Sequence, residues 1–401
     1  MSEPVHIIGV GRTDFQRNLR KSGQTLRDVI VEAGGAAIAD AGLTPKDIES
    51  AIVGNFAGGL FTGQLHLGAL VTEIDPALRG IPTMHVEAAC ASGGVAVLNA
   101  VQQIMGGMHE VALVVGAEQQ KTMSAADGAK VLGAAADVAG ERAQYGEFLF
   151  PKLFARIAQE YAARCGLSEK QLAEVAVKNR AQCRLNPLAQ MRDSKLTLEE
   201  ASTESVDNRM IAPPLKVSDC SPITDGAAAL VVCSQRFLER LRPQRAIRLL
   251  GFGHTTDYLA LEKKDIPAFP IAAKAATRAY TMAGVTPHDL HGAEVHDCFS
   301  ISEIVQYEIL GLAEAGQGVA LLESGATALG GRCPVNAGGG LIGDGHPVGA
   351  TGVRQVVEAY QQLTERAGPR QIAGARRFLT CNIGGSLTTT VVIIWGGDQI
   401  G

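Results

Sequence analysis

The chain alternates between short apolar runs and longer amphipathic stretches. Apolar runs such as Val111–Val115 and Val391–Trp395 have the length and β-branched content of buried strands. Stretches such as Phe154–Cys165 and Glu169–Cys183 carry apolar residues at the 3.6-residue spacing of a helix. Strands that alternate with helices of about 10 to 15 residues are typical of mostly parallel sheets with helices on both faces. The pattern therefore predicts an α/β protein.

Two segments of this pattern recur at one offset. Ile7–Gly11 returns as Leu249–Gly253, and Ala41–Ile48 returns as Ala283–Leu290, both 242 residues later. A shared offset indicates an internal duplication. Each half is expected to begin with a strand, a helix, a Thr-Pro turn and a second strand.

The later parts of the halves also match, because Gly94–Gln103 resembles Gly352–Gln361 and an apolar strand follows each. The residues between about 118 and 215 have no counterpart in the second half. We therefore expect a first half formed by residues 1–117 and 216–243, an inserted lobe at 118–215, and a second half at 244–401.

Composition narrows the class of protein. The longest apolar runs fall far short of the ~20 residues of a membrane helix, so no membrane span is expected. The net charge of −5 argues against nucleic-acid binding. The segment 121–245 is mildly basic, with 18 basic against 15 acidic residues, as suits a lobe that meets a small polyanionic ligand. Glycine is in excess at 47 of 401 residues, which predicts many tight turns.

The cysteines give no sign of a metal site or a disulfide framework, since no Cys-x-x-Cys pair and no Cys/His cluster at zinc spacing occurs. The N-terminus lacks the charged and apolar regions of a signal peptide, and Asp398–Gly401 carries no recognisable address. We therefore expect a cytoplasmic protein in a reducing compartment. The eight cysteines are Cys90, Cys165, Cys183, Cys220, Cys233, Cys298, Cys333 and Cys381.

Cys90 lies in Ala-Ala-Cys-Ala-Ser-Gly-Gly, between a predicted strand and a predicted helix. Backbone N–H groups and the helix dipole at such a turn favour the thiolate, which predicts a lowered pKa and a nucleophile that accepts an acyl group. The alternative is a small buried cysteine at the start of a helix. The surrounding alanines and glycines leave room for a ligand and favour the functional interpretation.

A second candidate turn holds His296 and Cys298, two residues apart at the predicted end of a strand. Both side chains can point at one ligand from an irregular turn. In the alternative interpretation His296 and Asp297 form a surface pair, and Asp297 or Ser300 caps the helix that follows.

The densest glycine stretch is Gly338–Gly352, and it places His346 directly ahead of a helix. It is not a P-loop because no Gly-Lys-Ser/Thr follows, and Gly9-Val10-Gly11 lacks the third glycine of a dinucleotide-binding turn. Backbone so poor in side chains builds little core, so His346 is better interpreted as a general base or an oxyanion donor.

Cys381 closes the last repeated strand, and Gly384 and Gly385 follow it. Free N–H groups of this turn can form an oxyanion hole. A catalytic thiol and a buried strand-end cysteine are equally good interpretations of Cys381. The remaining cysteines, with His66 and His254, lack comparable surroundings.

These motifs together resemble the thiolase superfamily, and within it the sterol-carrier-protein-type thiolases and their bacterial acetyl-CoA acetyltransferase relatives. They comprise the Cys90 turn, His296-Asp297-Cys298-Phe299, the Gly345-His346-Pro347 loop and the glycine turn after Cys381, and the match spans nearly the whole chain. The resemblance implies a thiolase fold of two βαβαβαββ halves in five αβαβα layers, with an inserted lobe over coenzyme A. It also implies a homodimer or homotetramer and no metal.

By resemblance, Cys90 is acylated and His346 takes its proton. His296 completes an oxyanion hole with His346, and backbone N–H groups of Cys90 and of Gly384 or Gly385 form a second. The acid/base thiol is Cys298 in the sterol-carrier type and the position of Cys381 in commoner thiolases. Cys381-Asn-Ile-Gly is one residue longer than the usual Cys-x-Gly, which favours Cys298. No sterol-carrier domain is expected to follow.

The resemblance makes acetyl-CoA and coenzyme A substrates rather than permanently bound cofactors. Arg209 and Lys216 are candidate contacts for the phosphates of coenzyme A, and Phe299 for the acyl pocket. The expected activity is reversible Claisen condensation and thiolysis between acetyl-CoA and an acyl-CoA. Two alternatives stay open: an acyltransferase for an unusual acceptor that works with a small accessory protein, and a non-catalytic or lyase-like paralogue that binds CoA esters.

Overall fold

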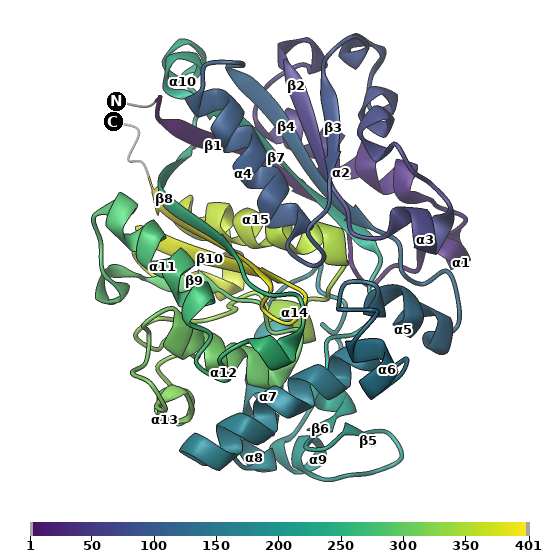
Figure 1. The fold of residues 1–401 in the computed structure, drawn as a ribbon. Coiled ribbons are helices and arrows are strands. Elements are labelled where there is room, and N and C mark those ends of the chain that lie inside the picture. Colours follow the sequence, from purple (N-terminus) through teal and green to yellow (C-terminus); the bar gives the residue numbers. More distant parts are fainter. Residues whose placement is uncertain (1–2, 398–401) are drawn as a thin grey trace.

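The computed structural model describes residues 3–397 (Figure 1). The first two residues and the C-terminal segment Asp398–Gly401, whose sequence carries no recognisable address, lie outside the described residues. No helix between residues 3 and 397 combines the length and the apolar character needed to cross a membrane.

The first half follows the predicted βαβαβαββ order. Its elements are β1 (Val5–Arg12), α2 (Leu26–Asp40), β2 (Ser50–Gly54), α3 (Gly58–Thr62), β3 (Thr83–Val86), α4 (Ser92–Met105), β4 (Val111–Glu118) and β7 (Gly226–Ser234). The short α1 (Leu19–Ser22) and α10 (Gln235–Leu241) flank it.

The second half repeats this order, except that its third strand is shortened to a single bridge. Its elements are β8 (Ile247–Thr256), α11 (Pro270–Ala283), β9 (Gly292–Glu294), α12 (Ser300–Ile309), α13 (Gly318–Glu323), α14 (Gly340–Gly343), α15 (Thr351–Leu363), β10 (Arg377–Gly384) and β11 (Thr389–Gly397). The counterpart of β3 is a single parallel bridge between Ala293 and Val335, because the chain enters its glycine-rich loop at this point.

The repeated glycines have a packing role. A Cβ atom at Gly9 or Gly11 would overlap the backbone of α2, and one at Gly251 or Gly253 would overlap the backbone of α11. The first strand of each half therefore lies directly against its helix. Each Thr-Pro turn is closed in the same way in both halves, since the N–H groups of Thr44 and Thr286 donate to an aspartate three residues later at 2.8 Å.

The strands form one nine-stranded sheet in the order β3-β2-β4-β7-β1-β8-β11-β10-β9. The pairs β2/β3, β2/β4 and β9/β10 are parallel, as expected from helical crossovers. The expectation of mostly parallel sheets is wrong for the last strand of each half. β11 follows β10 through a tight turn and β7 returns from the lobe, so both pair antiparallel with both of their neighbours.

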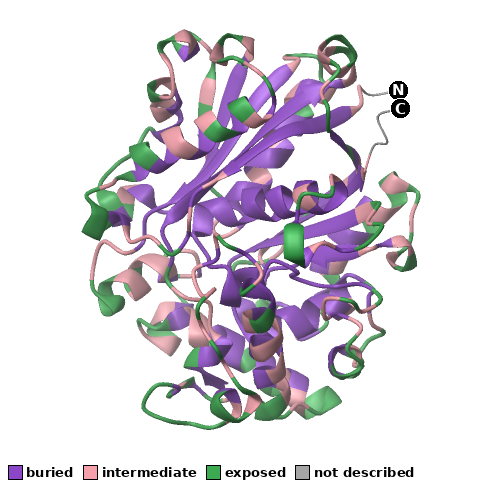
Figure 2. Ribbon diagram, turned by 180° about the vertical axis from the view of Figure 1, so that it is seen from behind, coloured by how far each residue is buried: buried purple, intermediate pink, exposed green. Residues whose placement is uncertain are grey.

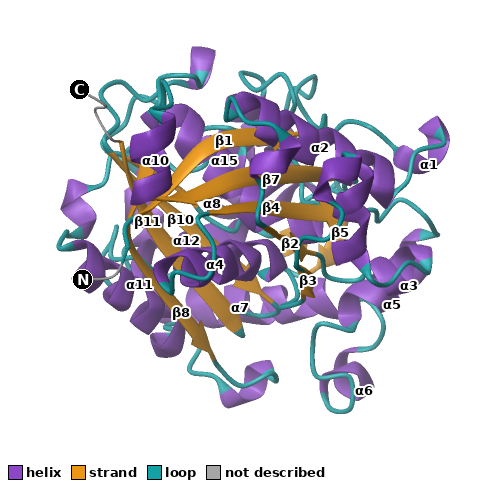
Figure 3. Ribbon diagram, turned by 90° about the horizontal axis from the view of Figure 1, so that it is seen from above, coloured by secondary structure: helices purple, strands orange, loops and turns teal. Residues whose placement is uncertain are grey.

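The helices and strands form five layers, and three apolar clusters fill the spaces between them. α2 covers the outer face of the first-half strands, α4 and α15 lie together between the two halves, and α11 and α12 cover the outer face of the second-half strands (Figures 1 and 3). The central helix α15 is buried along nearly its whole length (Figure 2). The first residues of β1 and β8 pair with each other and join the halves.

The lobe between β4 and β7 is mostly helical. It packs on the second half, where α7 and α8 contact α12, and it occupies the lower part of Figure 1. Its elements are α5 (Ala125–Gly133), α6 (Glu141–Tyr145), α7 (Leu149–Cys165), α8 (Glu169–Cys183), α9 (Leu198–Ser202), β5 (Met210–Ala212) and β6 (Leu215–Lys216). The exact boundaries given above for the lobe stay a prediction.

Candidate active site

Cys90 occupies a strained turn between β3 and α4. Ala89 before it has a φ of +52°, in the left-handed region that alanine rarely adopts. The Ser92 hydroxyl accepts from the N–H of Ala88 at 2.9 Å and donates to the carbonyl of Ala89 at 2.6 Å, which holds this turn. The half-buried thiol is thereby fixed at the start of α4, as the sequence predicted.

The glycine turn between β10 and β11 meets this thiol. The N–H of Gly385 donates to Cys90 Sγ, and Gly385 has a φ of +64°. The N–H of Gly385 is therefore the donor that faces Cys90, while Gly384 ends β10 opposite Thr389. A Cβ at Gly384 would overlap the carbonyl oxygen of Ala88, so only glycine allows this close approach.

The expectation of a lowered Cys90 pKa is wrong. Burial raises the pKa of Cys90 to about 12, and the N–H of Gly385 lowers it by less than burial raises it. The carboxylates of Glu118 and Glu87 raise the Cys90 pKa further. Burial outweighs the helix start, so the resting group is a thiol and needs a base when it reacts.

His346 is the candidate for that base. Burial and the nearby Arg354 lower its pKa to about 3, so the imidazole is neutral. Its Nδ1 lies 2.7 Å from the Thr351 hydroxyl, which itself donates to the carbonyl of Pro347 at 3.1 Å. With the hydroxyl proton directed at Pro347, Nδ1 of His346 must donate to Thr351. The free lone pair of His346 is then on Nε2.

His296 lies beside His346, with ring centroids 5.0 Å apart and planes at 88°. Its backbone is clamped on both sides: the N–H donates to Gln306 at 2.9 Å, and the carbonyl accepts from Ser302 at 2.7 Å. Burial, His346 and Arg354 lower the pKa of His296 well below its usual value, so this ring is neutral too.

The two candidate acid/base thiols lie differently. Burial and then the charge of Cys90 raise the pKa of Cys298, whereas burial alone raises the pKa of Cys381. Cys381 is buried on the face of β10 that packs into the outer apolar cluster, with Leu379 and Ile383. Alternate side chains of a strand point to opposite faces, so Cys381 points away from Cys90.

Asp297 and Ser300 do not cap α12. The Asp297 carboxylate accepts from the N–H groups of Leu341 and Ile342 at the start of α14, at 2.7 and 3.1 Å. The Ser300 hydroxyl donates to Asp219 at 2.9 Å. Asp297 and Ser300 connect buried segments. His296 and Asp297 are both buried, so they form no surface pair.

The remaining predicted contacts fall in or against the lobe. The ring of Phe299 stacks on Phe154 of α7 with centroids 4.6 Å apart. Arg209 is exposed just before β5. Lys216 is buried and forms an ion pair with Glu169 at 2.5 Å, so its charge is already partnered.

The sequence did not single out Asn382 or Thr351. Asn382 follows Cys381, and the period of two along β10 turns it to the inner face. There its Nδ2 donates to the Cys90 carbonyl at 2.9 Å. That alternation was the available signal for Asn382, whereas nothing local marked the bond from His346 to Thr351.

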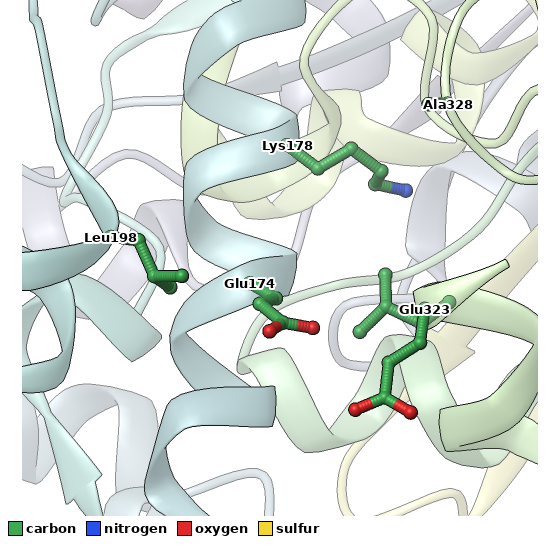
Figure 4. Close-up of a pocket in the computed structure, with 6 residues that line it drawn as sticks. Glu174, Lys178, Leu198, Glu323 and Ala328 are labelled. Atoms are coloured by element: carbon green, nitrogen blue, oxygen red, sulfur yellow. The ribbon is translucent and has the colours of Figure 1, made fainter. Parts of the chain in front are cut away.

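Within residues 3–397, the ligand atoms of Cys90, His296 and His346 lie within 4.8 Å of one another, a grouping that can also hold a metal ion. A cavity of about 420 Å³ lies elsewhere, between α8, α13 and the following loop (Figure 4). Glu174, Lys178 and Glu323 line it, and Lys178 reaches from its wall to Glu303. None of the three clustered residues lines this cavity.

Comparison with known proteins finds matches over nearly the whole chain. The model of the thiolase N-terminal domain matches residues 5–236, and that of the thiolase C-terminal domain-like family matches residues 253–397. An acetyl-CoA acetyltransferase of Methanothermobacter thermautotrophicus is 38% identical over 98% of this chain and 99% of its own length. Sterol carrier protein 2 of Gallus gallus is 34% identical over 96% of this chain and 70% of its own length. The solved Ltp2-ChsH2(DUF35) aldolase superposes with a TM-score of 0.83 at 24% identity, over 99% of this chain and 98% of that one.

Proposed function

The chain belongs to the thiolase family, and from this premise we propose that it is an acetyl-CoA C-acyltransferase that works through an acyl-Cys90 intermediate. The observation that carries the proposal is the convergence of Cys90, His296 and His346 within 4.8 Å, from loops of both halves. A thiol, a neutral base and a neutral donor at one point are the groups that acyl transfer requires.

In thiolysis, Nε2 of His346 takes the Cys90 proton while Sγ attacks the 3-oxo carbon of a 3-oxoacyl-CoA. The bond between the α-carbon and that carbon then breaks, leaving an acyl thioester on Cys90 and the enolate of acetyl-CoA. Cys298 gives its proton to the enolate carbon. The thiol of a second coenzyme A gives its proton to the Cys298 thiolate and attacks the acyl-Cys90 carbonyl. The bond to Cys90 Sγ breaks, Sγ takes back the proton held by His346, and acyl-CoA is released. Condensation is the reverse sequence.

Two oxyanion holes support these steps. Nε2–H of His296 and protonated His346 hold the thioester oxygen of acetyl-CoA, where the enolate charge develops. The N–H groups of Cys90 and Gly385 hold the carbonyl oxygen of the acyl enzyme. Gly385 is preferred to Gly384 because its N–H already donates to Sγ.

Cys298 is proposed as the acid/base thiol because its pKa responds to the charge of Cys90, whereas burial alone raises the pKa of Cys381, which lies on the opposite face of β10 from Asn382. Phe299 is proposed to border the acyl site, because its ring stacks on Phe154 of α7 where the lobe packs on the second half. Arg209 is the better candidate for a coenzyme A phosphate, because Lys216 is buried against Glu169.

Coenzyme A is a substrate in this proposal, and the reaction as written uses no metal and no permanently bound cofactor. The wider expectations of a cytoplasmic homodimer or homotetramer stand as part of the proposal. The accessory-protein alternative predicts that the purified chain alone does not turn over simple 3-oxoacyl-CoAs.

The test is the intact mass of the purified chain after mixing with acetoacetyl-CoA. The proposal expects an acetyl adduct that is absent in Cys90→Ala and present in Cys381→Ala. An adduct that persists in Cys90→Ala would refute the proposed nucleophile. No adduct in any variant would favour the accessory-protein or non-catalytic alternatives.

A further inference from the structure

The side chain of Asn382 connects the nucleophile turn to His296. Its Nδ2 lies 2.9 Å from the carbonyl oxygen of Cys90 and 3.1 Å from Nδ1 of His296. Its Oδ1 accepts from the N–H of Gly94 in the first turn of α4, at 3.0 Å. One amide of the second half thus contacts two backbone groups of the first half and one imidazole.

These contacts fix which end of the amide is which. The N–H of Gly94 can only donate, so the atom facing it must be the oxygen. The carbonyl of Cys90 can only accept, so the atom facing it must be the nitrogen. Both assignments agree, and Nδ1 of His296 therefore faces an N–H donor.

Because the His296 ring is neutral, it carries one proton on its two nitrogens. Nδ1 accepts from Asn382, so the proton must be on Nε2. We infer that Asn382 is a positioning residue that holds His296 in the Nε2–H tautomer, so that this ring donates to the substrate oxyanion. The neighbouring His346 has the opposite arrangement, with its Nδ1–H directed at Thr351.

The fold leaves a slot for this amide. A Cβ atom at Gly94 would lie 2.9 Å from Asn382 Oδ1, and one at Gly352 would overlap it. The two glycines start α4 and α15, the paired helices of the central layer. Asn382 is buried among them, so its amide has little room to turn over.

The inference rests on the proposed function, because it assigns a cause to the donor role of His296. It adds that this role depends on a residue outside the His296 turn. In a neutral ring with Nδ1–H, Nε2 would present a lone pair to the oxyanion and repel it. The tautomer therefore decides whether His296 helps or hinders the enolate.

The first experiment measures the tautomer directly. Ring ¹⁵N chemical shifts of histidine-labelled protein at pH 8 distinguish a protonated from an unprotonated nitrogen, and His296→Gln identifies the signals of His296. The wild-type protein should show His296 protonated on Nε2. A wild-type His296 protonated on Nδ1 would overturn the inference, and this measurement requires no Asn382 variant to fold.

The second experiment changes the partner. Asn382→Asp retains the shape and the acceptor for Gly94, but it presents an acceptor to Nδ1 and so favours Nδ1–H. Asn382→Leu keeps a similar volume and removes all three hydrogen bonds. We expect kcat to fall about 100-fold in Asn382→Asp with KM little changed, the size expected for a lost oxyanion donor, and to fall less in Asn382→Leu.

Because Asn382→Asp also turns a carboxylate oxygen toward the Cys90 carbonyl, the readout that separates the two roles is the ring shift of His296: a merely structural role would leave its proton on Nε2 in both variants. The matched control is Asn208→Asp, a buried asparagine of the lobe whose Oδ1 likewise accepts a backbone N–H and whose Nδ2 donates to backbone carbonyls. It should leave the ring shifts of His296 unchanged. Nε2–H retained in Asn382→Asp with wild-type kcat would overturn the inference.

The two measurements distinguish a failure of the proposed function from a failure of this inference. Wild-type protein with His296 protonated on Nε2 but no acyl adduct on Cys90 would refute the acyltransferase mechanism. In that case a move of the His296 proton from Nε2 to Nδ1 in Asn382→Asp would still support the inference that Asn382 sets the tautomer of His296.

Discussion

The imidazole rings of His296 and His346 lie edge to face, 5.0 Å apart, and present opposite chemistry to Cys90. The Thr351 hydroxyl accepts a hydrogen bond from Nδ1–H of His346, and the amide of Asn382 donates one to Nδ1 of His296. In the proposed mechanism one ring therefore accepts the thiol proton while the other donates to an oxyanion. Both rings are neutral in the resting protein because burial lowers their pKa values.

Cys298→Ala should lower thiolysis and condensation by about 100-fold or more, because the enolate carbon loses its proton donor and acceptor. Acylation of Cys90 by acetyl-CoA should persist, since that step uses His346. Cys381→Ala is the matched control and should keep turnover, because Cys381 faces the outer apolar cluster. Steady-state rates combined with intact mass check this. Loss of turnover in Cys381→Ala alone would reverse the assignment.

Alkylation of Cys90 by iodoacetamide should rise about tenfold per pH unit from pH 7 to pH 10 without a plateau. The raised pKa of Cys90, about 12, leaves the thiolate a small fraction that grows with pH across this window. Acylation by acetyl-CoA should stay nearly flat between pH 6 and pH 9, because His346, with a pKa of about 3, remains a neutral base. Peptide mass mapping of Cys90 over time measures both rates. A plateau of alkylation near pH 8 would contradict the raised pKa.

Gly384→Ala should lower kcat at least about 100-fold, since the new Cβ overlaps the Ala88 carbonyl and displaces the Gly385 N–H from Cys90. Gly128→Ala is the control: its site in α5 is open and helical, so alanine should stabilise the fold by about 0.5–1 kcal/mol and leave kcat unchanged. Thermal unfolding and kcat separate the two effects. Wild-type kcat in Gly384→Ala would show that the approach of the glycine turn does not matter.

Lys264→Met should lower kcat about tenfold, because Lys264 supports the glycine turn between β10 and β11. The buried Lys264 donates to the Ser386 carbonyl and to the Thr388 hydroxyl, both at 2.7 Å, and so ties down the residues after Gly385. Methionine keeps the stem and removes these donors, each worth about 1 kcal/mol. Lys263→Met, at the exposed neighbouring position, should have no effect on kcat. Equal kcat values for the two variants would exclude a role for Lys264 in positioning the turn.

Much of this protein is set by local sequence. Periodicity predicted the strands and helices, with α8 found over the predicted Glu169–Cys183. The repeat predicted two similar halves, because Gly-x-Gly and Thr-Pro-x-Asp act through contacts with their own half. The turns at Cys90, His296 and His346 were visible for the same reason, since glycines and strand ends mark them locally.

Tertiary structure decided what depends on burial and on the meeting of the halves. The Cys90 pKa rises because packing removes water from a thiol that a helix start alone would activate. Lys216 is enclosed and paired with Glu169, which its sequence neighbours do not indicate. Cys381 points away from Cys90 while Asn382 reaches it across 292 residues of chain. The sequence alone does not determine such contacts, because they exist only once both halves pack around α4 and α15.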